Sequence, residues 1–331
     1  IDVKDFRTDE KRALLEQIYT MTERRFALFR HLLSAEEYDF AMMVEMGPDR
    51  IHHAFWRFCD PDHRLYEPGN EFEDVIRDYY IHLDGEIGRV LEGLDGRTSV
   101  MIVSDHGAKT MQGGICINEY LMNEGLLALK KEPPGPTRLH PSMIDWKGTK
   151  AWGEGGYYAR IFFNVSGREP EGVIEPAELE GFRARLAAKL EAIEDDRGRN
   201  IGTRVFVPDE IYRECRNIPP DLIVYLGDLD WRSVGSVGCG GKIPLFENDT
   251  GPDDANHAKE GVFAWYNRGG EGSAASGARA ENDARSGGGT HSGAKGAAPE
   301  GRGSYSIYDV APSILDFFSI EVPKEMIGRV I

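Results

Sequence analysis

Two short apolar segments are each followed directly by a polar cluster, and this arrangement narrows the possible folds more than any other feature. Residues 38–46 form a mainly apolar run that ends at Gly47, and residues 100–103 form a second run that ends at Ser104. Between them, apolar residues recur at three- and four-residue intervals, which predicts a helix over residues 66–91. Largely apolar strands joined by a helix are typical of parallel α/β sheets, whose strands are buried on both faces.

The rest of the chain continues this alternation of helical and strand-like periodicity. Helices are predicted over residues 9–33, 175–193 and 308–318, and strands over residues 158–165, 203–207, 221–226 and 261–266. We therefore expect an α/β protein, built as a three-layer α/β/α sandwich around a mostly parallel sheet. A small embedded α/β lobe is expected over residues 167–216. Residues 268–303 are rich in Gly, Ser and Ala, and are expected to form a flexible surface insert.

The charge balance restricts the kinds of partner. The chain carries 39 Lys and Arg against 56 Asp and Glu, a formal net charge of −17. A protein that reads a nucleic-acid backbone needs a basic face, so we expect no nucleic-acid-binding surface. No apolar run reaches the roughly 18 residues that span a bilayer, so no membrane segment is expected. The four cysteines show no CxxC spacing, which fits reduced thiols in a cytoplasmic protein.

The first polar cluster places Asp49 four residues before His53, directly after the first predicted strand. In parallel α/β sheets, ligands bind at the carboxyl ends of the strands, so both polar clusters can face one site. A carboxylate and an imidazole at i and i+4 can chelate one divalent ion when the turn between them is helical. The alternative is that Asp49 caps a helix that starts there, with His52 and His53 on its surface.

The second polar cluster contains Asp105 and His106. They place oxygen and nitrogen ligands where the backbone changes direction, and Gly107 allows the turn. The alternative is an ordinary turn closed by an Asx hydrogen bond from Asp105. His257 ends an acidic loop before the strand predicted at residues 261–266. Alone it is better explained as a loop residue. It becomes a candidate metal ligand only as a third partner of the two polar clusters.

Together these residues form a coherent set of oxygen and nitrogen ligands: Asp49, His53, Asp105, His106 and His257. Such ligands suit Zn²⁺, and also Mn²⁺. Two divalent ions about 4 Å apart can clamp the attacking and leaving oxygens of an in-line displacement at phosphorus. The set therefore predicts two divalent metal ions, with zinc as the first candidate, and a hydrolase that acts on phosphate esters.

The motifs around these ligands, and the end of the chain, resemble a known family. The matching runs are Pro48-Asp49-Arg50-Ile51-His52-His53, Ser104-Asp105-His106-Gly107, Asn256-His257-Ala258-Lys259-Glu260-Gly261-Val262-Phe263, Ile307-Tyr308-Asp309-Val310-Ala311-Pro312-Ser313-Ile314-Leu315 and Met326-Ile327-Gly328-Arg329. The sequence resembles the alkaline phosphatase superfamily, in its type I phosphodiesterase/nucleotide pyrophosphatase branch, over nearly the whole chain apart from the Gly-rich insert. The resemblance implies that Asp49, His53 and His257 hold one metal, and that Asp105 and His106 bind the other. It also implies an alkaline-phosphatase-like fold and a small phosphorylated or nucleotide substrate.

In that family, an upstream segment supplies a further metal-binding Asp and a Thr or Ser nucleophile, which forms a covalent phospho-enzyme intermediate. None of Thr8, Thr20, Thr22 or Thr110 lies in the expected strand-to-helix context. The nucleophile is therefore expected upstream of this chain, and residues 1–331 are expected to form the C-terminal portion of one α/β catalytic domain.

Other functions of the same ligand set stay open. A phosphomutase or a sulfatase of the superfamily would keep these ligands and catalyse a different reaction. Sulfatases use a Cys-x-Pro-x-Arg motif, but the run from Cys59 to His63 places a histidine at the Arg position and follows Asp49 instead of preceding it. A rival from another class is a non-catalytic metal-binding module that lacks the nucleophile.

Substrate contacts are predicted at Lys147 and Lys150. The run from Trp146 to Trp152 places both lysines and two indoles close together, where they could stack a base and contact a phosphate. The alternative is a pair of packed tryptophans with lysines that extend into solvent. The sequence indicates no oligomeric state.

Overall fold

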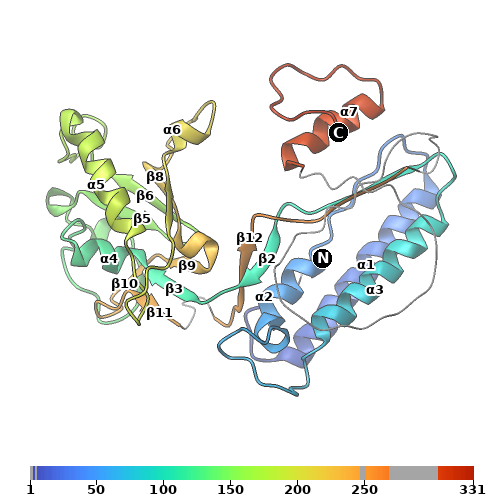
Figure 1. The fold of residues 1–331 in the computed structure, drawn as a ribbon, viewed down its shortest axis with the longest axis horizontal. Coiled ribbons are helices and arrows are strands. Elements are labelled where there is room, and N and C mark those ends of the chain that lie inside the picture. Colours follow the sequence, from blue (N-terminus) through green and yellow to red (C-terminus); the bar gives the residue numbers. More distant parts are fainter. Residues whose placement is uncertain (1–2, 4–5, 247–250, 268–304) are drawn as a thin grey trace. The chain divides into compact units, whose positions relative to one another are not determined.

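The computed structural model describes residues 3, 6–246, 251–267 and 305–331 (Figure 1). The chain divides into two compact units, the first made of residues 1–87 and 109–257 and the second of residues 88–108 and 258–331. No helix among the described residues combines the length and the apolar character that a membrane span requires. The insert expected over residues 268–303 lies outside the described residues.

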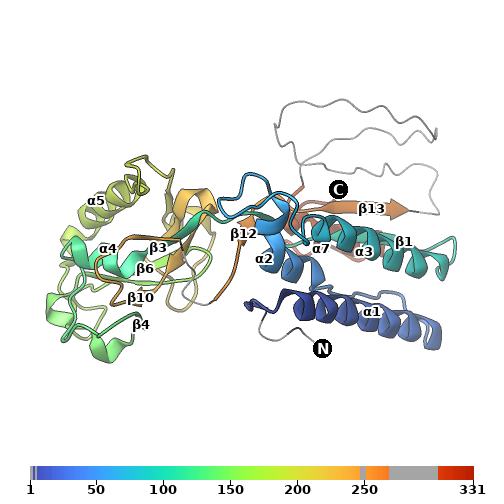
Figure 2. The same ribbon diagram turned by 90° about the horizontal axis from the view of Figure 1, so that it is seen from below.

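Three helices form one part of the first unit: α1 (Lys11–Ala35), α2 (Gly47–Cys59) and α3 (Val75–Glu92), the last of which ends in the second unit. Helices α1 and α3 lie side by side (Figures 1 and 2). The inner side of α1 carries Leu14, Ile18 and Met21, all buried and spaced by helical intervals. The Thr22 hydroxyl of α1 lies 2.9 Å from the Tyr79 hydroxyl of α3. The helix predicted over residues 9–33 is confirmed.

Helix α2 begins where only glycine fits. A Cβ atom on Gly47 would lie 1.7 Å from the hydroxyl oxygen of Tyr79. Pro48 follows in the first turn, where its missing N–H costs no hydrogen bond. Ile51 and Phe55 face inward and are completely buried. These contacts fix the rotation of α2 about its axis, and therefore the direction of its polar residues.

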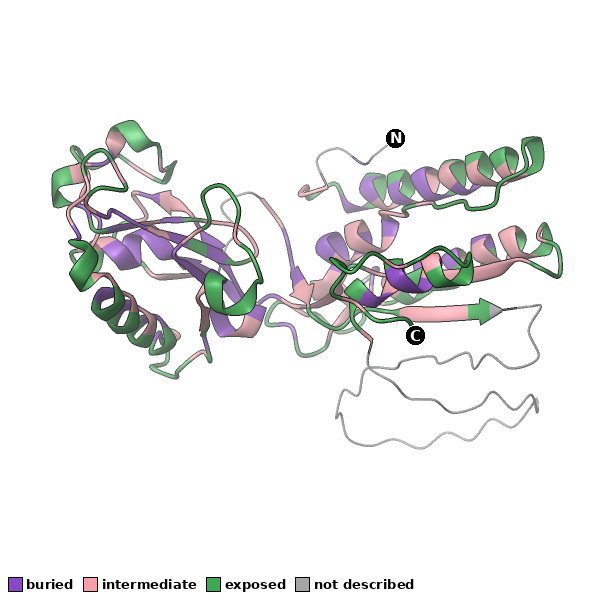
Figure 3. Cartoon of the chain, turned by 90° about the horizontal axis from the view of Figure 1, so that it is seen from above, coloured by how far each residue is buried: buried purple, intermediate pink, exposed green. Residues whose placement is uncertain are grey.

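An antiparallel four-stranded sheet, in the order β5-β6-β8-β7, builds the main apolar core of the first unit. Its strands and flanking helices are β5 (Ala151–Glu154), β6 (Ala159–Phe163), β7 (Arg204–Phe206), β8 (Leu222–Tyr225), α4 (Ile117–Asn123) and α5 (Leu179–Glu191). Phe163 packs edge-on against Phe182 of α5, with ring centroids 4.9 Å apart. Buried residues are concentrated around this sheet (Figure 3).

Shorter strands complete the first unit. A three-stranded sheet, β11-β3-β9, contains β3 (Gly113–Cys116), β9 (Trp231–Val234) and β11 (Pro244–Leu245). Two-stranded sheets are formed by β4 (Thr137–Arg138) with β10 (Ser236–Val237), and by β2 (Gly107–Thr110) with β12 (Ala255–Ala258). The remaining short helices are α6 (Pro208–Ile211), η1 (Pro141–Met143), η2 (Trp146–Gly148), η3 (Pro176–Glu178) and η4 (Leu226–Leu229).

The second unit contains an antiparallel strand pair and a short helix. Strand β1 (Ser99–Val103) pairs with β13 (Phe263–Asn267), and η5 (Ile307–Asp309) leads into α7 (Val310–Phe317). A capping box starts this helical segment: the Ser306 side chain accepts the Tyr308 N–H, and Asp309 accepts the Ser306 N–H. Asp309 also accepts the backbone N–H of Arg329, which holds the end of the chain against α7.

The structure corrects one strand prediction, shortens the helix predicted over residues 66–91 to α3, which begins at Val75, and leaves the sandwich prediction unconfirmed. Residues 38–46 form no strand; they are irregular, and their alternate apolar side chains are exposed. The predicted strand–helix–strand unit is therefore absent, and β1 pairs with β13 in the antiparallel sense. Over the described residues the protein is mixed α/β, but its strands form five small sheets that are mostly antiparallel. The lobe expected over residues 167–216 stays a prediction.

Candidate metal centre

Helix α2 places Asp49 and His53 on consecutive turns of the same face. The Oδ1 atom of Asp49 lies 3.3 Å from the Nε2 atom of His53. The His53 side chain is buried, whereas Asp49 is partly open to solvent. The alternative, in which Asp49 caps the helix and His53 lies on its surface, does not hold: α2 begins at Gly47 without a side-chain cap, and His53 is buried beside the carboxylate.

Strand β12 brings His257 to the same point from 204 residues further along the chain. Its Nε2 atom lies 3.2 Å from Nε2 of His53 and 3.6 Å from Oδ1 of Asp49. The three ligand atoms are all within 4.8 Å of one another, and no further residue joins this group in the described part of the chain. We call Asp49, His53 and His257 the three-residue cluster.

The spacing of the three-residue cluster suits a divalent ion. Ligand atoms at the corners of a tetrahedron with zinc–nitrogen bonds of 2.0–2.1 Å are about 3.4 Å apart. The observed separations of 3.2, 3.3 and 3.6 Å bracket that value. One carboxylate oxygen and two imidazole nitrogens are also the donor types that zinc and manganese accept. The residues present therefore fit a metal ion.

The pKa values show that the cluster stabilises positive charge. Burial disfavours the charged form of His53, but hydrogen bonds to Asp253 and Asp49 outweigh it and raise the pKa of His53 to about 9. Burial also acts to raise the pKa of Asp49, but hydrogen bonds to His257 and His53 prevail and lower it. In the absence of a metal ion, a proton on His53 supplies the positive charge that these groups favour.

Two residues that the sequence did not single out complete the surroundings. Asp253 is buried and its Oδ1 atom lies 2.7 Å from Nδ1 of His53. The ring of Tyr157 stacks on that of His257, with centroids 3.9 Å apart, and its hydroxyl lies 3.4 Å from Nε2 of His53. The sequence offered one indication that Asp253 belongs to the site, namely its position in the acidic run before His257. No sequence feature indicated that Tyr157 does.

The other predicted ligands, Asp105 and His106, lie outside the three-residue cluster. They follow β1 in the second unit, and the Asp105 side chain is 86% exposed. The Nδ1 atom of His106 lies 2.9 Å from the carbonyl oxygen of Gly107, and its Nε2 atom lies 3.6 Å from Asp105. Their role as ligands of a second metal stays a prediction.

The predicted substrate lysines are both exposed. Lys147 lies in η2 and Lys150 directly precedes β5. Trp146 and Trp152 pack edge-to-face with centroids 5.0 Å apart. A substrate role for the two lysines stays a prediction. Cys59, in the run compared with the sulfatase motif, is a free thiol that donates to the Phe72 carbonyl oxygen.

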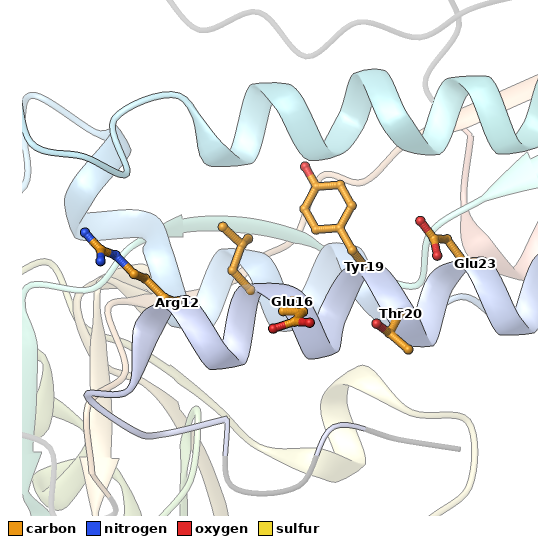
Figure 4. A pocket seen from close by; sticks show the side chains of 6 residues that line it. Arg12, Glu16, Tyr19, Thr20 and Glu23 are labelled. Carbon is orange, nitrogen blue, oxygen red and sulfur yellow. The ribbon is translucent and has the colours of Figure 1, made fainter.

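A shallow hollow of about 490 Å³ lies elsewhere, along α1 (Figure 4). It is lined by Arg12, Leu15, Glu16, Tyr19, Thr20 and Glu23. The Tyr19 ring extends from α1 towards α3, where it contacts Tyr79 and His82. None of the candidate site residues lines this hollow.

The fold and the site define an α/β protein with a candidate metal centre. A family described as type I phosphodiesterase / nucleotide pyrophosphatase matches residues 2–253, and the chain therefore belongs to this family of the alkaline phosphatase superfamily. Asp49 and His53 lie within the match, and His257 follows it by four residues. Membership suggests a phosphodiesterase- or pyrophosphatase-type hydrolase. No match was found among curated proteins.

Proposed function

We propose that this protein is a metal-dependent hydrolase of phosphate esters, acting on phosphodiesters or nucleotide pyrophosphates by in-line attack at phosphorus. The three-residue cluster carries the proposal, because two imidazole nitrogens and a carboxylate oxygen converge at metal-binding distances in a member of the phosphodiesterase family. Asp49, His53 and His257 would hold one divalent ion, zinc or manganese. Asp105 and His106 would contribute to a second.

The protein residues have defined tasks in this proposal. A bound divalent ion would supply Lewis-acid stabilisation of the charge that develops on the phosphoryl oxygens. Asp49 provides the negative charge that balances the cation, and Arg50 holds the other carboxylate oxygen, with its Nη1 atom 2.8 Å from Oδ2. The stacked Tyr157 ring covers one face of His257 and limits its access to water.

The test compares the full chain with His53→Asn, His257→Ala and His31→Ala. His31 is an exposed histidine on α1 and serves as the matched control. Bound zinc and manganese are measured by mass spectrometry, and turnover is followed with bis-(p-nitrophenyl) phosphate, a nucleotide p-nitrophenyl ester, p-nitrophenyl sulfate and a sugar phosphate. We expect the two cluster variants to lose metal and at least about 100-fold in activity, as expected for removal of a metal ligand.

Each other outcome has a defined meaning. Unchanged metal content in both cluster variants would overturn the proposal. Turnover of the aryl sulfate in place of the phosphate esters would identify a sulfatase, and turnover of sugar phosphates without net hydrolysis a phosphomutase. Metal binding that depends on the cluster, without turnover of any substrate, would support the metal centre and remove the support for hydrolysis by residues 1–331.

A further inference from the structure

The buried carboxylate of Asp253 contacts His53 on the side of the imidazole ring that faces away from the cluster. Its Oδ1 atom lies 2.7 Å from Nδ1 of His53, while Nε2 of the same ring points towards Asp49 and His257. The Asp253 side chain is only 1% exposed. This hydrogen bond joins residues 200 positions apart and is among the best-buried polar contacts of the site.

The second oxygen of Asp253 is also occupied. Arg7 donates from Nε to Oδ2 at 2.9 Å, and its Nη2 atom lies at the same distance. The Arg7 guanidinium in turn lies over the Phe6 ring, 4.6 Å from its centroid, and Phe6 contacts the His53 ring. With one oxygen on His53 and the other on Arg7, the carboxyl group is held in one orientation.

This geometry excludes Asp253 as a direct ligand at the same point. The His53 atom that lies close to the ligand atoms of Asp49 and His257 is Nε2. Asp253 instead forms its hydrogen bond with Nδ1, the other nitrogen of the ring. An acceptor at Nδ1 keeps the proton on that nitrogen, so the lone pair of the neutral imidazole is at Nε2. It also makes the ring a stronger donor to a metal and prevents it from rotating.

We propose that Asp253 is the positioning residue of the metal centre, and that it sets metal affinity by fixing the tautomer and orientation of His53. The inference rests on the proposed function, because it assigns a role towards the same metal ion. Arg7 acts one step further out, by holding the Asp253 side chain in the correct orientation.

The neighbouring Asp254 offers a matched control. It is equally buried and lies in the same segment, and its backbone N–H donates to the carbonyl oxygen of His53. Its side chain, however, lies near Arg57 and Lys11 and not beside the His53 ring. Asp254→Asn therefore removes a buried carboxylate from this segment without changing the contact to His53.

The experiment measures zinc affinity of the full chain by competition with a chromophoric chelator, for Asp253→Ala, Asp253→Asn and Asp254→Asn. Loss of such a hydrogen-bond partner typically weakens metal binding about 10- to 100-fold, which we expect for Asp253→Ala. Asp253→Asn keeps an acceptor of the same shape without the charge, and should lose less. Asp254→Asn should bind zinc as the unmodified chain does.

A second readout reports the tautomer directly. In ¹H–¹⁵N spectra of the zinc-loaded chain, the Nδ1–H signal of His53 should be protected from exchange in the unmodified protein and in Asp254→Asn. It should be lost in Asp253→Ala. If Asp253→Ala does not fold, the isosteric Asp253→Asn decides by its zinc affinity, which should fall because the charge of the carboxylate is lost: an unchanged zinc affinity in Asp253→Asn would overturn the inference.

The two proposals fail in different ways. If His257→Ala binds zinc as tightly as the unmodified chain, the metal centre itself is wrong. If His257→Ala loses zinc while both Asp253 variants keep the affinity and the His53 signal, the metal centre stands and Asp253 has no positioning role.

Discussion

His53 and His63 show how strongly the surroundings of a side chain decide its chemistry. Both are buried, and they lie on α2 and just after it. Two carboxylates accept hydrogen bonds from His53 and raise its pKa to about 9 despite burial. At His63, burial and the charge of Arg64 lower the pKa to about 4. The first ring is suited to a cationic site, and the second is a neutral acceptor for the Leu65 N–H.

The low pKa of His63 predicts that the free energy of unfolding depends on pH. Its pKa is about 4 in the folded chain against a usual 6.5, so the unfolded chain binds the extra proton between these values. Stability from the neutral ring is therefore complete above pH 6.5 and is lost as the pH falls towards 4. In His63→Asn, which keeps an acceptor for Leu65, the midpoint of urea unfolding should depend less on pH in this window.

Circular dichroism at matched urea concentrations measures this slope. The exposed His140 gives the control, because His140→Asn should leave the slope unchanged. An identical slope in His63→Asn and the unmodified chain would contradict the prediction.

Residues 38–46 show what can be predicted of an element from sequence. The helices α1, α5 and α7 follow their predicted ranges closely, because helical hydrogen bonds are local and periodicity reports them directly. A strand also needs a partner, which can lie anywhere in the chain. The described residues provide none for residues 38–46, and Tyr38, Phe40, Met42 and Val44 are exposed.

The same reasoning explains which parts of the site were predictable. Asp49 and His53 are four residues apart on a helix, so spacing alone places them together. His257 could be included only as a member of a set of ligands. Its neighbours Asp253 and Tyr157 reach the cluster through contacts between distant segments, which a single sequence does not encode locally.

Because alternate apolar side chains of residues 38–46 are exposed, we expect the fold to tolerate polar substitutions in this run. In the double variant Phe40→Ser/Met42→Ser, the free energy of unfolding should change by less than about 0.5 kcal/mol, because both side chains already contact solvent. Ile18→Ala, at a fully buried position of α1, should instead cost about 2–5 kcal/mol. Urea unfolding followed by circular dichroism measures both. A loss in the double variant as large as that of Ile18→Ala would show that residues 38–46 are packed in solution.

For the whole molecule, the net charge of −17 describes the surface and not the site. That charge alone disfavours an anionic phosphate ester. Two divalent ions would add four positive charges where the substrate lies, and the local field would then differ in sign from the global one. The acidic composition is thus compatible with the proposed substrates.

A metal ion bound only by the folded chain should also stabilise it. At a free zinc concentration of about 100 times the dissociation constant, one site should add about 2.7 kcal/mol to the free energy of unfolding. Differential scanning calorimetry should therefore show a higher melting temperature with zinc and a lower one after EDTA treatment. In His257→Ala the two temperatures should coincide, and a zinc effect of unchanged size in that variant would contradict the prediction.

The placement of Asp49 and His53 on successive turns of α2 has a consequence for how this stretch can vary. Replacing Arg50 or His52 leaves the two ligands one helical turn apart, whereas Ile51 between them is completely buried and is held by its packing as well. Inserting or deleting one residue there turns one ligand about 100° around the helix axis relative to the other, since each residue adds that rotation. Between these two positions the helix therefore fixes the length of the chain, and the burial of Ile51 restricts its composition as well.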